Sequence, residues 1–242
     1  MTYKHTSSQR GNDASGSSLL SELAGEASSK LHGIKSATQE RQDRDQRLHA
    51  ALNRIFQFFH PFSGHVNNIA PTLPRTYAID TQTAYTSLKW LDAHTDSRKQ
   101  ALSDVALLDH VSFHVRLLAP EPVVVTRRWN QLDTLKKELG NFSLRALDDL
   151  DMLLRNKSQQ ETFRARLAPD FYVKIKFQGS YDDGLILMQC SNLDGFGPAT
   201  YQLSPEHVTA QLLDDIGRFL IGRIHSLPSP LARARCAPKQ FI

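Results

Sequence analysis

The sequence predicts an α+β fold: an antiparallel sheet of two meanders, helices packed on one face of it, and a long N-terminal helical arm ahead of it. Two segments, residues 110–117 of the expected strand 109–118 and residues 171–178, alternate between apolar and polar side chains, which is typical of strands with one buried face. A third segment, residues 39–47, is entirely polar with interleaved charges, which favours a solvated helix. Strand patterns and helical patterns in separate blocks indicate the α+β class.

Composition divides the chain into five segments. Residues near the start are rich in Ser, Gly, Asn, Asp and Thr, and a cluster of prolines and Gly64 follows the first helical pattern. We expect a disordered N-terminus (1–17), a helical arm (18–60), a linker (61–75), an α+β domain (76–227) and a basic C-terminal tail (228–242).

The helical arm changes character along its length. Apolar residues recur at helical spacing from Leu19, Gly25 and Gly33 weaken this part, and a capping-box pattern begins at Ser36. After the polar run, one face is apolar, and Pro61 is expected to end the helix because proline has no amide hydrogen to donate. That apolar face consists of Leu48, Leu52, Ile55 and Phe59. It is expected to dock either onto the body of the protein or onto a second copy.

The first meander is expected around residues 76–129. Its clearest strand, 109–118, alternates between an apolar and a polar face, and the prolines at 120 and 122 indicate a turn. Residues 123–129 are expected to return as the partner strand.

The second meander is expected around residues 163–203, after two short helices at 130–140 and 144–155. Strands at 171–178 and 185–191 flank the hairpin turn 180–184, and 196–203 adds a further strand. A last helix is expected to start at Ser204, with Pro205 in its first turn.

Known catalytic and cofactor motifs are missing from the sequence. It contains no GxxxxGK[ST], no GxGxxG after a strand, no GxSxG and no HExxH, and the histidines at 110 and 114 are too far apart along a strand to share a metal ion. Cys190 and Cys236 form no CxxC pair, which fits a reducing compartment. We therefore expect no metal site and no cofactor, and the sequence favours a protein that is not an enzyme.

Two functions remain as hypotheses, with an enzyme of unrecognised site as a third. The first is a non-enzymatic protein-interaction module or adaptor in the cytoplasm, because no signal peptide or membrane span is recognised; it would self-associate through Leu48, Leu52, Ile55 and Phe59. The alternative is a nucleic-acid-binding accessory protein, because the net positive charge of +4 resides in the last 25 residues, which carry five basic residues and no acidic one. Its contacts would be a basic sheet face, with Lys174 and Lys176 beside Tyr172, and the following basic residues: Arg127, Arg128, Arg233, Arg235 and Lys239.

Overall fold

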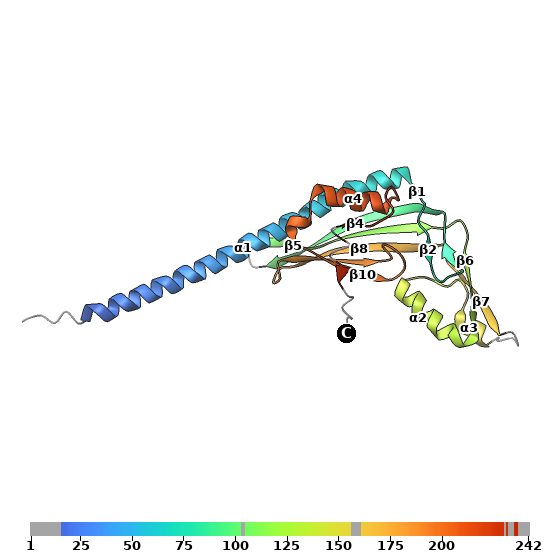
Figure 1. Cartoon of the computed structure of the whole chain (residues 1–242), viewed down its shortest axis with the longest axis horizontal. Coiled ribbons are helices and arrows are strands. Elements are labelled where there is room, and N and C mark those ends of the chain that lie inside the picture. The colour runs from blue at the N-terminus through green and yellow to red at the C-terminus, as the bar shows by residue number, and fades with distance from the viewer. Residues whose placement is uncertain (1–15, 103–104, 156–160, 230, 232–234, 237–242) are drawn as a thin grey trace, which may run out of the picture. The chain divides into compact units, whose positions relative to one another are not determined.

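The computed structural model describes residues 16–102, 105–155, 161–229, 231 and 235–236, and it confirms the α+β class: a long N-terminal helix, a curled antiparallel sheet and further helices (Figure 1). The chain divides into two units, one ending at Arg44 and the other beginning at Asp45. The sheet and its core belong to the second unit. Of the N-terminal segment 1–17, residues 1–15 lie outside the described residues.

In the part of the chain that the structure describes, the main sheet has seven antiparallel strands and joins parts of the two expected meanders. The junction is the pairing of β5 with β8, in which Val115 lies opposite Val173. In spatial order the strands are β1 (Thr72–Leu73), β4 (Leu88–Leu102), β5 (Val105–Leu118), β8 (Asp170–Ser180), β9 (Leu185–Ser191), β10 (Pro198–Leu203) and β11 (Arg235–Cys236).

Two small sheets accompany the main one. β2 (Tyr77–Ala78) pairs with β3 (Ala84–Tyr85), and β6 (Val123–Arg128) pairs with β7 (Thr162–Leu167). The expectation that 123–129 pairs with 109–118 was therefore wrong. Both edges of β5 are already taken, by β4 on one side and β8 on the other, so β6 must find its partner elsewhere.

The α-helices among the described residues are α1 (Gly16–Ile69), α2 (Leu132–Phe142), α3 (Leu150–Arg155) and α4 (Ala210–Leu220), and short 3₁₀ helices span Trp129–Gln131 and Pro205–His207. α1 continues through Pro61, so the helix end and the linker expected at 61–75 were misplaced. Tertiary contacts hold the turns after the proline: the Ser63 hydroxyl lies 2.6 Å from that of Thr95 in β4, and Val66 is buried. The Asn67 side chain also donates to the Ala93 carbonyl of β4 and accepts a hydrogen bond from the Ala93 amide.

One face of the sheet forms the core. The apolar residues of β5 and β8 that alternate in the sequence are all buried, and α1 and α4 cover them (Figure 1). Close helix packing is visible at Gly217, where an added Cβ would lie 3.1 Å from the Phe58 ring. The core side chains of these two strands are Val111, Phe113, Val115, Leu117, Phe171, Val173, Ile175 and Phe177.

Candidate interaction surfaces

The four side chains expected to mediate self-association lie inside the second unit. Leu48, Leu52, Ile55 and Phe59 each have 0% of their surface exposed. The Phe59 ring centre lies 4.8 Å from that of Phe113 and 5.7 Å from that of Phe177. The apolar face was recognised from its spacing, but its partner is this chain's own sheet, so these residues offer no surface to a second copy.

A different apolar surface is exposed on the first unit. Five large apolar side chains of α1 have between 51% and 70% of their surface exposed, namely Leu19, Leu20, Leu23, Leu31 and Ile34. Four of them, together with the exposed Ala27, recur every three or four residues and so share one side of the helix. We call Leu20, Leu23, Ala27, Leu31 and Ile34 the N-terminal stripe.

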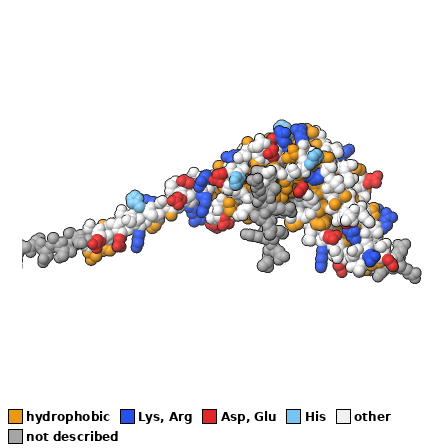
Figure 2. All heavy atoms as spheres, viewed as in Figure 1, with side chains coloured by type: hydrophobic (Ala, Val, Ile, Leu, Met, Phe, Trp, Pro, Cys, Tyr) orange, Lys and Arg blue, Asp and Glu red, His pale blue; other side chains and the backbone are white. Residues whose placement is uncertain are grey.

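The periodicity of the N-terminal stripe was visible in the sequence, but exposure was not. An apolar helical face is usually buried by its own chain, as the face from Leu48 to Phe59 is. Figure 2 shows hydrophobic side chains on the surface of this part of α1, interspersed with charged ones. The space around Gly25 and Gly33 is also open, since a Cβ added at either glycine would meet no atom within 4 Å.

The polar side of the main sheet carries a group of basic and aromatic residues. In the strand register, His94 of β4 lies opposite His114 of β5, and His114 lies opposite Lys174 of β8. Tyr172 is 39% exposed, and the Lys174 ammonium lies 5.8 Å from its ring centre. We call Arg116, His114, Tyr172, Lys174 and Lys176 the polar sheet face.

Acidic neighbours offset part of this charge. Arg116 forms an ion pair of 2.8 Å with Asp170, and His94 lies 3.0 Å from Asp96. Partial burial, then the nearby positive charge of Lys174, lowers the pKa of His114. His114 is therefore neutral at pH 7, and the two lysines carry most of the remaining positive charge of the polar sheet face.

Arg127 has its partners within the chain. Its guanidinium contacts the carboxylate of Asp80 and lies 4.0 Å from that of Glu138, and only 17% of its side chain is exposed. Burial acts to raise the pKa of Asp80, but amide hydrogen bonds and Arg127 lower it overall. Arg127 is thus engaged in an internal ion cluster, a role that its position in a strand sequence did not indicate.

Of the other basic residues expected to contact nucleic acid, the structure describes the side chain of Arg128. Arg128 is exposed next to the internal cluster. Arg235 lies in β11, paired with Tyr201 of β10, and its side chain is outside the described part of the structure. Arg233 and Lys239 lie outside the described residues.

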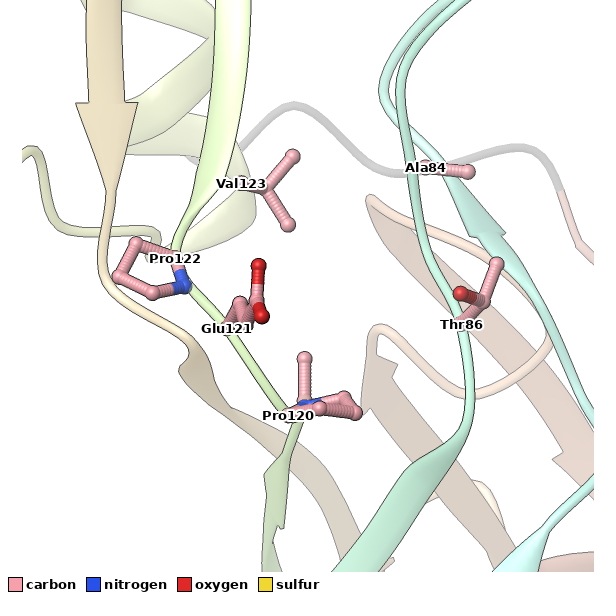
Figure 3. Close-up of a pocket in the computed structure, with 7 residues that line it drawn as sticks. Ala84, Thr86, Pro120, Glu121, Pro122 and Val123 are labelled. Carbon is pink, nitrogen blue, oxygen red and sulfur yellow. The ribbon is translucent and has the colours of Figure 1, made fainter.

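A shallow pocket of about 330 Å³ lies between the segments around β3 and the β5–β6 connection (Figure 3). Its lining is mainly Ala, Pro and Val, and its polar side chains are those of Thr86 and Glu121. Among the described contacts, no hydrogen bond joins the Thr86 hydroxyl to the Glu121 carboxylate.

Other reactive groups are held in structural contacts. Cys190 is 5% exposed, and burial raises the pKa of its thiol, which keeps it protonated. His110 Nδ1 lies 2.8 Å from an Asp109 oxygen, and Gln178 donates to the other oxygen at 2.7 Å. Across the described ranges, no three His, Cys, Asp or Glu side chains gather in a way that could hold a metal ion.

Within the part of the chain that is described, no helix has the length and apolar character needed to cross a bilayer. No family model matches the sequence, and comparison with curated proteins and with solved structures gave no significant match. The geometry of the two exposed surfaces is therefore the basis for assigning a function.

Proposed function

We propose that the protein is a non-enzymatic protein-interaction module that binds a partner helix through the N-terminal stripe. The observation that carries this proposal is the exposure of four large apolar side chains at helical spacing, each more than half exposed. Soluble helices seldom leave such a row in water, because each Leu or Ile buried at an interface contributes about 1.5–3 kcal/mol.

The spacing of the N-terminal stripe suits a helical partner. Side chains three and four residues apart form a narrow apolar row, and such a row packs against a second helix or in a helical groove. Charged and small polar residues cover the other sides of this part of α1, including Ser21, Ser29 and Glu40. The contact is thereby restricted to one side of the helix.

A pair of matched variants tests the proposal. Leu23→Glu with Leu31→Glu places two charges in the stripe, and Ser29→Glu with Ser36→Glu adds the same charge on the opposite side of the helix. Chemical crosslinking in cell extract, followed by mass spectrometry, should identify partners that the wild type and the serine variant share and the leucine variant loses. Identical partners for all three proteins would contradict the proposal.

A second candidate function is nucleic-acid binding by the polar sheet face, favoured by the placement of Lys174 and Lys176 next to the exposed Tyr172. A lysine pair can neutralise phosphates while a tyrosine ring stacks on a base. The basic C-terminal tail would add further phosphate contacts.

The second candidate is tested by fluorescence anisotropy with a single-stranded oligonucleotide across a salt series. Lys174→Glu with Lys176→Glu should weaken binding and flatten its salt dependence. Lys137→Glu with Arg223→Glu, at exposed positions away from the polar sheet face, is the charge-matched control. Equal loss in both variants, or no salt-sensitive binding of the wild type, excludes this function.

A further inference from the structure

The charges beside the N-terminal stripe indicate which molecule binds to it. This inference rests on the proposed function, in which the stripe is an interaction surface. With 100° of rotation per residue, Glu26 and Lys30 flank the same edge of the stripe, and Lys35 flanks the opposite edge together with Ala24 and Ser28. All five residues are exposed.

We propose that the N-terminal stripe pairs with the same stripe of a second copy of this chain, in antiparallel orientation. In an antiparallel helix pair each edge of the stripe faces the same edge of the other copy, running in reverse. With the centre of the pair near residue 28, Glu26 of each copy lies beside Lys30 of the other, and two interchain ion pairs form by symmetry.

The apolar residues fit the same register. Leu23 of one copy lies opposite Ile34 of the other. The two small residues Ala24 and Ala27 lie near the centre, where they allow the helices to approach closely and leave room for Leu31 of the second copy. The stripe is therefore complementary to itself in shape as well as in charge.

A parallel pair is disfavoured by the same charges. In that orientation each edge faces the opposite edge of the other copy, and Lys30 lies beside Lys35, five residues further along. Two like-charge contacts then replace the two ion pairs. The apolar row spans about four helical turns, so the antiparallel dimer is expected to be weak and to dissociate on dilution.

Light scattering on the full-length chain at increasing concentration tests self-association. We expect the mass to rise from 27.3 kDa toward twice that value. Leu23→Glu with Leu31→Glu should weaken the dimer more than about a hundredfold, since four buried leucines are lost per dimer. Ser29→Glu with Ser36→Glu should leave it unchanged, and circular dichroism should show equal helix content in all proteins.

Charge variants report the orientation. Lys30→Glu should weaken an antiparallel dimer roughly three- to tenfold, because two attractive contacts become repulsive, and adding Glu26→Lys should restore it. In a parallel dimer Lys30→Glu would instead strengthen association, through attraction to Lys35.

Crosslinking provides an independent readout of orientation. In a Cys236→Ser background, a mixture of Leu20→Cys chains and Thr38→Cys chains should form a disulfide-linked heterodimer, and neither chain alone should form a linked homodimer. Crosslinking of each chain with itself means a parallel pair and overturns the proposal.

The measured mass and the partners captured from extract together distinguish a failure of the dimer from a failure of the proposed interaction module. A wild-type mass that stays at 27.3 kDa up to the solubility limit overturns the second-copy proposal. If stripe-dependent partners are still captured from extract in that case, the interaction module stands with a different occupant. If no stripe-dependent partner is found either, both proposals fail.

Discussion

Asn192 connects three segments of the chain from a fully buried position. Its side-chain amide donates to the carbonyls of Phe142 and Tyr172 at 2.8 and 2.9 Å, and its side-chain oxygen accepts from the Gly197 amide at 3.0 Å. It also adopts a left-handed backbone conformation, with φ of 60°, which asparagine tolerates better than most residues. The residue thus ties α2, β8 and the β9–β10 connection together.

Asn192→Ala is expected to lower the free energy of unfolding by about 2–4 kcal/mol, because buried carbonyls and an amide lose their partners. Urea denaturation monitored by circular dichroism measures this change. Asn68→Ala, at an exposed position of α1, is the control and should change stability by less than about 0.5 kcal/mol. A similarly small effect at Asn192 would show that its hydrogen bonds contribute little.

His114 reports the electrostatics of the polar sheet face. Partial burial, then the positive charges of Lys174 and His94, holds the pKa of His114 below its ordinary value of 6.5, while Asp96 acts to raise it. NMR titration should give a value below 6.5 for wild type and a higher one for Lys174→Met, with Lys176→Met unchanged. A wild-type value at or above 6.5 would show that this surface is less positive than the structure indicates.

The lowered pKa of His114 also sets the direction of a stability change with pH. As pH falls below about 6.5, the unfolded chain takes up this proton before the folded chain does, so His114 increasingly destabilises the fold. Above that range the residue is neutral in both states and has no such effect on stability. Replacing His114 by Gln should reduce the loss of stability between about pH 7 and pH 5.

Among the elements, α4 starts later in the structure than its sequence pattern predicts. Ser204 and Pro205 have the composition of a helix start, but they begin a short 3₁₀ turn, Pro205–His207. The α-helix begins later, where the Thr209 hydroxyl accepts a hydrogen bond of 3.1 Å from the Leu212 amide. The expected cap was therefore wrong by five residues, because Val208 turns into the core between the two starts.

Thr209→Ala should destabilise the protein by about 1 kcal/mol through loss of this cap. Ser204→Ala, the matched substitution at the expected cap, should cost less than about 0.5 kcal/mol because Ser204 makes no capping hydrogen bond. Thermal or urea unfolding of the two variants distinguishes the positions. Equal losses would mean that both residues support the turn to the same degree.

At the scale of the whole molecule, the boundary at Asp45 predicts which truncated chains fold. A chain of residues 45–242 keeps the core and should unfold cooperatively, within about 1 kcal/mol of the full-length protein. A chain that begins at residue 62, near the expected linker, loses Leu48, Leu52, Ile55 and Phe59. Each removal from a core costs about 2–5 kcal/mol, and the sum matches or exceeds the stability of a typical domain.

Circular dichroism and urea unfolding of both truncated chains check this prediction. Cooperative unfolding of residues 62–242 would show that the sheet does not need the α1 face it packs against. The same two chains also bear on the dimer, because both lack the N-terminal stripe and should remain monomeric.

Local patterns were sufficient for several elements. The alternation in β5 and β8 identified their buried faces correctly, since side chains of a strand point to opposite sides in any fold. The stripe of α4, from Leu212 to Leu220, was likewise buried as its spacing indicated. Pairing was not accessible in the same way, and β6 was assigned to the wrong partner because pairing depends on residues far apart in the chain.

Side-chain periodicity was enough to predict the α+β class, most of the buried faces and the two apolar rows on α1, because it follows from local backbone geometry. Which of the two rows is core and which is surface became known from the folded chain. The row from Leu48 to Phe59 meets the aromatic residues of the sheet and is fully buried, and the N-terminal stripe remains exposed. Periodicity reveals that a face is apolar, whereas burial depends on what the rest of the chain places against it.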